Sequence, residues 1–282
     1  MKYCRFQVSG RPQYGLVETV AGREEITRLL VNAPEDSNGD MEDVPTRRVE
    51  PVPLAEATLL APVRPSKIVC VGRNYREHAA ELGHDVPVEP LIFLKPPSAL
   101  LAPGGEIRRP NISQRVDHEG ELGVVVAKTC YKVRPDEDVR PYILGYTCVN
   151  DVTARDLQEK DGQWTRAKGF DTFCPVGPVV SDEVDPWAGV TVETRVNGEV
   201  RQRGSTVDFI FALDVVIRIA VHDAFPRRFD FDRHAFRRRS ARVWRCGRGE
   251  CPGGRRSQES GGGRVMDPRG LVVLAGIQSN QF

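Results

Sequence analysis

Two glutamates, Glu119 and Glu121, stand two positions apart at the start of an apolar run that continues to Val126. Such a run is typical of a β-strand, in which successive side chains point to opposite faces of a sheet. Both carboxylates are therefore expected on the same face, directly beside apolar neighbours. The fold must contain a sheet that holds this strand, with acidic groups gathered at one of its ends.

The two carboxylates repel each other, so something must offset the repulsion if they are held close together. A hard divalent cation such as Mg²⁺ or Mn²⁺ takes oxygen ligands and keeps positions open for water or substrate. The alternative is a solvated strand edge, where the glutamates need no partner. Asp151 favours the cation, because it follows a second apolar strand, and side chains at such places often form sites.

Strand and turn patterns dominate the first 221 residues and predict a β-rich chain. We expect a hairpin at 3–18, strands at 67–72, 91–94, 119–126 and 142–149, and a second hairpin at 190–200 with an Asn-Gly turn. We expect short helices at 74–82, capped by Asn74, and at 152–159, and a longer helical period at 206–219. The expected division is a small β-rich domain with its linker, 1–62, a catalytic domain, 63–221, and an aberrant tail, 222–282.

Composition excludes several classes of protein. With 40 basic and 39 acidic side chains the net charge is +1, which gives no overall attraction to nucleic acid or to an anionic membrane. The first 22 residues lack the apolar run of a signal peptide, and no apolar stretch reaches about 18 residues. Seven scattered cysteines without a CxxC pair argue against a zinc site or a disulfide scaffold. We therefore expect a cytoplasmic protein with no membrane or nucleic-acid partner.

Several motifs in a fixed order resemble those of the fumarylacetoacetase (fumarylacetoacetate hydrolase) family, from about residue 67 to residue 219. They are Val71-Gly72-Arg73-Asn74-Tyr75 with His78 and Glu81, Phe93-Leu94-Lys95-Pro96, His118-Glu119-Gly120-Glu121-Leu122, Asn150-Asp151-Val152-Thr153-Ala154-Arg155-Asp156, Lys168-Gly169-Phe170-Asp171 and Cys174-Pro175-Val176-Gly177-Pro178. The resemblance implies an α+β, β-rich fold, a mixed β-sandwich roll with a small N-terminal domain.

The resemblance also implies a metal centre. Glu119, Glu121 and Asp151 would hold Mg²⁺ or Mn²⁺, which would act as a Lewis acid on keto and carboxylate or enolate oxygens. Lys168 would place a positive charge beside the same oxygens.

Further matching residues would serve the substrate or the proton. In relatives the pair that matches His78 and Glu81 lies on a short lid-like helix, where the carboxylate orients the imidazole so that it takes a proton from water. Arg73 and Asp171 would contact the substrate, although an aspartate in the place of Asp171 can also simply hold a loop. We expect His84 and His118 to serve structure or orientation.

The family's substrates carry a 2-keto acid or 1,3-dicarbonyl unit, as in fumarylacetoacetate, acylpyruvates and 2-hydroxyhepta-2,4-dienedioate. The implied protein is a metal-dependent hydrolase or isomerase of catabolism, and a homodimer. One alternative is an impaired or inactive member that retains metal binding. A second alternative is oxaloacetate decarboxylase-type activity.

The resemblance ends after Ile219. Residues 222–270 contain thirteen arginines and no lysine, together with runs of arginine and of glycine. Such a segment could bind RNA, but it lacks the regular aromatic residues of a nucleic-acid module and the apolar period of a folded one. Few apolar residues among so many charges cannot offset the entropy of ordering the chain, so the sequence predicts a protease-sensitive region here.

A frameshift near Val221 explains the tail better. One permitted choice of codons for residues 222–238, read one base later, encodes Met-Thr-Leu-Phe-Pro-Gly-Asp-Leu-Ile-Ser-Thr-Gly-Thr-Pro-Ser-Gly. Family members continue at this point with an apolar helix, a Pro-Gly-Asp turn and a Thr-Gly-Thr-Pro segment that helps to hold the substrate carboxylate. We therefore expect the shifted frame to carry the missing part of the catalytic domain.

Overall fold

The computed structural model describes residues 1–37, 41, 44–75, 87–128, 133–220 and 271–276. In this part of the chain strands outnumber helices, so the expected α+β, β-rich class is confirmed. The expected helix at 74–82 and the expected tail at 222–270 lie almost wholly outside the described residues. None of the described helices is both long and apolar enough to span a bilayer.

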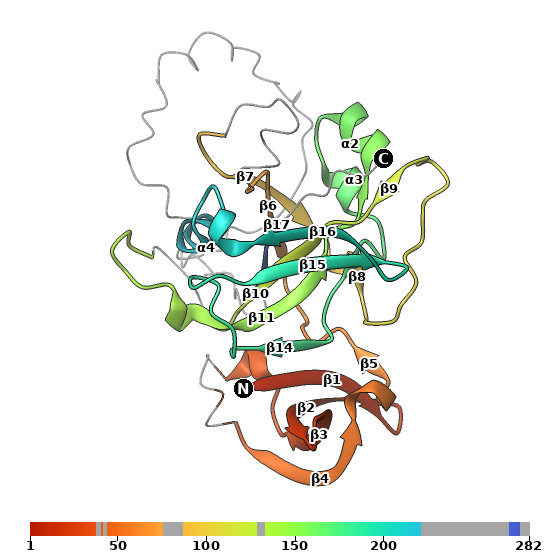
Figure 1. Ribbon diagram of the computed structural model, residues 1–282, viewed down its shortest axis with the longest axis vertical. Helices are drawn as coiled ribbons and strands as arrows, with labels where there is room; N and C mark the ends of the chain where they lie inside the picture. Colours follow the sequence, from red (N-terminus) through yellow and green to blue (C-terminus); the bar gives the residue numbers. More distant parts are fainter. Residues whose placement is uncertain (38–40, 42–43, 76–86, 129–132, 221–270, 277–282) are drawn as a thin grey trace, which may run out of the picture. The chain divides into compact units, whose positions relative to one another are not determined.

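One large sheet organises the described chain (Figure 1). Its order is β4 (Thr46–Pro53), β3 (Arg23–Leu30), β2 (Arg11–Val20), β1 (Lys2–Val8), β14 (Val179–Ser181), β11 (Ile143–Asn150), β10 (Gly120–Val126), β17 (Leu271–Gly276), β6 (Ile68–Gly72) and β7 (Leu91–Lys95), with β5 (Leu59–Leu60) paired to β1. All pairs are antiparallel except that of β17 with β6, which is parallel.

Short elements complete the architecture. The remaining strands are β8 (Leu100–Leu101), β9 (Val116–Asp117), β12 (Thr153–Ala154), β13 (Cys174–Pro175), β15 (Thr191–Val196) and β16 (Glu199–Ser205). The helices are α2 (Arg155–Asp161), α3 (Thr165–Lys168) and α4 (Leu213–Ala220), and the 3₁₀ turns are η1 (Pro34–Asp36), η2 (Leu54–Glu56), η3 (Pro97–Ala99), η4 (Arg140–Tyr142) and η5 (Thr206–Asp208).

The N-terminal strands form a meander rather than one hairpin. Ser9 and Gly10 have positive φ, as do Ala21 and Gly22, so each tight turn has the backbone twist that suits neighbouring antiparallel strands. The expected hairpin at 3–18 is present, with its turn at Ser9–Gly10. The third strand, β3, was not expected.

The central strands are buried on both faces, which explains why they lack an alternating pattern. Val125 lies in one core cluster, whereas Val124 and Val126 lie in another together with α4. The expected strands at 67–72, 91–94, 119–126 and 142–149 are confirmed as β6, β7, β10 and β11. The hairpin at 190–200 is confirmed as β15 and β16, with its turn at Asn197–Gly198.

This second hairpin packs against the backbone of β10. Gln202 accepts a hydrogen bond from the Gly120 amide and donates one to the Gly120 carbonyl, both at 2.8 Å. A Cβ on Gly120 would collide with the Thr194 hydroxyl, so only glycine fits between the two glutamates. The glycine of the Glu-Gly-Glu motif is therefore required by this packing.

Two expected helices begin later than their patterns suggested. The helix expected from residue 206 begins at Leu213, because the Thr206 hydroxyl bonds to the Pro186 carbonyl and accepts from the Val190 amide. The helix expected from residue 152 begins at Arg155. Asn74 is buried and exchanges two hydrogen bonds with the backbone of Phe211, while the helix that it was expected to cap lies outside the described residues.

One strand of the expected tail, β17, lies inside the large sheet. Strand β17 pairs Leu271 with Val126, Val273 with Val124 and Gly276 with Glu121. Residues 271–276 thus join β6 to β10, although the sequence placed them beyond the catalytic domain.

Candidate metal centre

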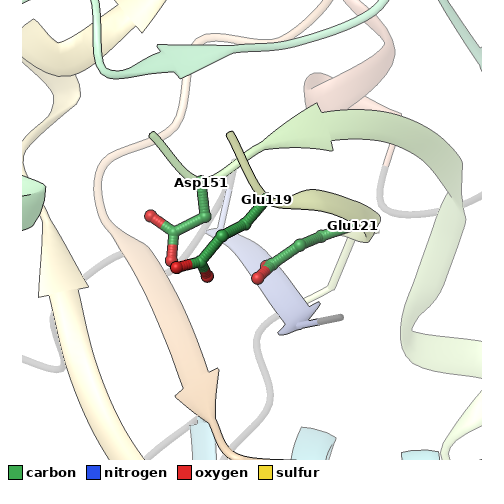
Figure 2. Close-up of side chains that lie close together, drawn as sticks. All are labelled: Glu119, Glu121 and Asp151. Atoms are coloured by element: carbon green, nitrogen blue, oxygen red, sulfur yellow. The ribbon is translucent and has the colours of Figure 1, made fainter. Parts of the chain in front are cut away.

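Three acidic residues converge where β10 begins and β11 ends (Figure 2). Glu119 and Glu121 lie on one face because they are two positions apart, and the Asp151 amide donates to the Glu119 carbonyl at 2.8 Å. All three side chains are buried, and each offers a carboxylate oxygen within 4.8 Å of the others. The cluster expected from the sequence is therefore assembled by the pairing of β10 with β11.

One carboxylate oxygen of Glu121 is available to bind a ligand. Its Oε2 is buried and has no hydrogen-bond partner among the described residues. Burial, followed by the neighbouring charges of Asp151 and Glu119, raises the pKa of the Glu121 carboxyl well above its usual value. A divalent cation would remove this penalty by supplying positive charge to the unpartnered oxygen.

Lys168, at the end of α3, contacts two of the three carboxylates. Its Nζ lies 2.5 Å from Asp151 Oδ2 and 3.0 Å from Glu119 Oε2, and the side chain is fully buried. Burial opposes the charged form, but Asp151, Glu119 and Glu121 outweigh it and raise the pKa of Lys168. The ammonium group is also 5.0 Å from the centre of the Phe93 ring, so it is held as a cation.

Lys95, the last residue of β7, is a site residue that sequence reasoning missed. Its Nζ lies 2.5 Å from Asp151 Oδ1 and 3.2 Å from the Val152 carbonyl, with no exposed side-chain surface. Burial alone would raise the pKa of Asp151, but Lys168 and Lys95 together lower it. The available signal was the position of a lysine at the end of an apolar strand.

Arg155, the first residue of α2, was missed as well. Its Nη1 lies 2.7 Å from Glu119 Oε1, and its Nε donates to Asp117 Oδ2 at 2.9 Å. The Thr153 hydroxyl donates to the same Glu119 oxygen at 2.9 Å. Both residues belong to the Asp-Val-Thr-Ala-Arg segment that follows β11, so the spacing after Asp151 was the signal.

The other predicted site residues do not join this cluster in the described chain. Arg73 follows β6 with a left-handed φ of 56°, and Asp171 is exposed in the turn after α3. His118 is half-buried next to Glu119. His78, Glu81 and His84 lie outside the described residues, so their roles stay predictions.

The donor set fits a hard divalent cation. Three buried carboxylates supply oxygen ligands, and one oxygen lacks any other described partner. Glu119, Glu121 and Asp151 are the residues that would hold Mg²⁺ or Mn²⁺, which would supply Lewis acidity to a bound carbonyl oxygen.

Two known families match the chain, one in its N-terminal part and one in its catalytic part. The family described as "Fumarylacetoacetate (FAA) hydrolase C-terminal" matches residues 67–223, and the one described as "Rv2993c-like, N-terminal" matches residues 1–62.

Similar proteins come from archaea and bacteria. The chain is 54% identical to the uncharacterized protein MJ1656 of Methanocaldococcus jannaschii over 53% of this chain and 62% of that one. It is 47% identical to protein Rv2993c of Mycobacterium tuberculosis, over 58% of this chain and 63% of that one. It is 42% identical to the oxaloacetate tautomerase YisK of Bacillus subtilis, over 58% of this chain and 56% of that one. The match thus covers somewhat less than two thirds of these relatives.

Solved structures match over more of the chain. A 5-carboxymethyl-2-hydroxymuconate delta-isomerase from Mycobacterium smegmatis is 30% identical, with a TM-score of 0.70 and coverage of 97% of this chain and 87% of that one. A 2-hydroxyhepta-2,4-diene-1,7-dioate isomerase from Mycobacterium marinum is 31% identical, with a TM-score of 0.70 and coverage of 99% and 88%.

Proposed function

Because the chain belongs to the family of fumarylacetoacetate hydrolase C-terminal domains, we propose that it is a divalent-metal-dependent enzyme that moves a proton on an enolisable 2-keto acid. The observation that carries the proposal is the buried acidic cluster, in which Glu121 keeps an unpartnered oxygen while Lys168 holds the other two carboxylates. Relatives named as oxaloacetate tautomerases and neighbours named as isomerases support this reaction type.

The residues present suit an enolisation. Negative charge develops on the keto oxygen as a proton leaves the adjacent carbon, and a fixed cation stabilises that charge most strongly where water is excluded. Lys168 is such a cation, since it is fully buried and its pKa is raised. Glu119 and Asp151 hold its Nζ in place, so the charge needs no reorganisation during the reaction. His78, oriented by Glu81, is our proposed proton carrier.

The experiment is an assay of proton movement and of bond cleavage on the same preparation. Oxaloacetate tautomerisation would be followed by the ultraviolet absorbance of the enol, and acylpyruvate hydrolysis by product formation, each with Mg²⁺, with Mn²⁺ and with chelator. We expect metal-dependent tautomerisation that Glu119→Gln abolishes. Glu199→Gln, on the exposed hairpin, is the matched control. Hydrolysis without tautomerisation would instead support the hydrolase, and release of carbon dioxide the decarboxylase.

A second candidate is a protein that binds the metal without turnover. It is favoured by the extent of the family match, which ends at residue 223, and by the limited share of the curated relatives that the chain covers. The acidic residues of the cluster all precede that point. Mn²⁺ binding with no reaction on any substrate of the panel would support this candidate.

We also propose that the protein is a homodimer, because the resemblance to the family implies a dimer. Light scattering of the purified protein tests the oligomeric state. A monomeric mass at micromolar concentration would contradict it.

A further inference from the structure

Each oxygen of the Asp151 carboxylate has an ammonium group of its own. Lys168 lies 2.5 Å from Oδ2 and Lys95 lies 2.5 Å from Oδ1. Lys168 also reaches Glu119, whereas the second contact of Lys95 is the backbone carbonyl of Val152. The two lysines therefore differ: one bridges two acidic side chains, and the other serves Asp151 alone.

The charges of the described site can be counted group by group. Three carboxylates face two lysines, which leaves one net negative charge. Arg155 contacts Glu119 and brings the balance to zero, because the Asp117 carboxylate beside its guanidinium is also paired with Arg115. The thiols of Cys70 and Cys174 add no charge, because burial raises the pKa of each and keeps it neutral.

A divalent cation would therefore give the loaded site two positive charges. Without Lys95 the same count would leave one. Charges in a buried site are weakly screened, so the loss of one unit weakens the attraction of the site for an anion. The second lysine is thus redundant for holding a cation, which it repels, but it is useful for holding a negatively charged substrate.

We infer that Lys95 is a positioning residue that acts through Asp151: it holds one oxygen of the Asp151 carboxylate and contributes one of the two positive charges that the metal-loaded site offers to an anionic substrate. The inference rests on the proposed function. It assigns a role to the Phe93-Leu94-Lys95-Pro96 motif, which the reaction otherwise leaves unexplained. It also requires metal and anion affinities to respond in opposite directions when the charge is removed.

The test uses the full chain with Lys95→Met and Lys95→Gln. Methionine removes the charge and the donor, while glutamine keeps a neutral donor. Lys160→Met, at an exposed position of α2, is the control. Mn²⁺ affinity would be measured by electron paramagnetic resonance, and affinity of the Mn²⁺-loaded protein for oxalate by calorimetry. Oxamate, which carries one negative charge instead of two, serves as the second anion.

We expect both variants to bind Mn²⁺ at least as tightly as the unaltered protein, because Lys168 still holds the other oxygen of Asp151. We expect them to bind oxalate about 10 to 100-fold more weakly, because one positive charge is lost beside a buried anion. Oxamate binding should weaken less than oxalate binding. Both variants should behave alike, because the charge rather than the hydrogen bond is at issue.

Three results would overturn the inference: a loss of Mn²⁺ affinity in either variant, unchanged oxalate affinity, or failure of both variants to fold. Glutamine restoring oxalate affinity would overturn it as well, because the donor alone would then suffice. Failure of the unaltered protein to bind Mn²⁺ is a distinct result, because it would overturn the proposed function itself.

Discussion

The guanidinium of Arg155 lies 2.7 Å from Glu119 Oε1, and the same group bonds to Asp117 at 2.9 Å. A planar fork that joins two carboxylates fixes both, and lysine cannot reproduce it. Arg155→Lys should therefore weaken Mn²⁺ binding by about 10 to 100-fold while leaving the fold intact. Calorimetry with Mn²⁺ checks this. Arg195→Lys, whose partner Glu193 lies on the exposed hairpin, is the control; equal affinity in all three proteins would contradict the prediction.

Glu121→Gln and Asp151→Asn should both abolish metal binding but should differ in their effect on stability. Glutamine at 121 removes a carboxylate whose Oε2 has no described partner, so the metal-free protein should be as stable as before or more so. Asparagine at 151 leaves Lys95 and Lys168 without their shared partner, which costs about 3 to 5 kcal/mol. Thermal unfolding without metal distinguishes the two; equal melting temperatures would show that the buried charges are not coupled as described.

His78→Ala should leave Mn²⁺ affinity nearly unchanged and slow the proposed reaction by about 10² to 10⁴-fold, the usual contribution of a positioned acid or base. Steady-state rates with saturating metal test it, with His84→Ala beside it as a control. An unchanged rate would show that His78 takes no part in the reaction.

Removing residues 271–282 should destabilise the whole sheet, because β17 supplies partners to both β6 and β10. Open edges in the middle of a sheet leave backbone groups without hydrogen bonds and expose apolar side chains. Circular dichroism should show loss of a cooperative thermal transition. A chain that ends at Ile277 keeps β17 and should melt like the full chain. An unaltered transition in the shorter chain would show that β17 is dispensable.

Restoring the reading frame proposed near Val221 should raise thermal stability and activity together. The shifted frame is expected to supply an apolar helix and a Thr-Gly-Thr-Pro segment in place of an arginine-rich one. Limited proteolysis should cut the present chain within residues 222–270 and spare the restored one. Clean raw sequence reads with no family-like continuation in the shifted frame would argue against the idea, as would resistance of residues 222–270 to protease.

The acidic cluster could be predicted because each part of it has a local signal. Glu119 and Glu121 share a face by their spacing alone, and Asp151 follows an apolar strand. The signal for Lys95, a lysine at the end of an apolar strand, does not point to a buried site. A lysine at a strand end ordinarily reaches solvent, and its burial against Asp151 depends on a contact across 56 positions of the chain. Such long-range pairing is decided by the assembled sheet.

The central strand β17 was missed for a related reason. Its apolar run follows a long arginine-rich segment, so local composition argued against a packed neighbourhood. Pairing with β10 and β6 overrides that argument, since a short apolar strand gains its stability from the strands on either side. The late start of α4 is similar, because the Thr206 hydroxyl forms tertiary hydrogen bonds and residues 206–208 form only a separate 3₁₀ turn.

The place of β17 in the sheet has a consequence for synthesis of the chain. Strands β6 and β7 leave the ribosome early, and β7 ends at Lys95. Strands β10 and β11, which lie next to the carboxylates, follow, and β17 is the last described element to emerge. Until then the nascent chain has two apolar edges that no neighbouring strand covers, a state prone to pairing with other chains. The large sheet can therefore be completed only at the end of translation, and chaperone binding during that interval would protect the growing protein from aggregation.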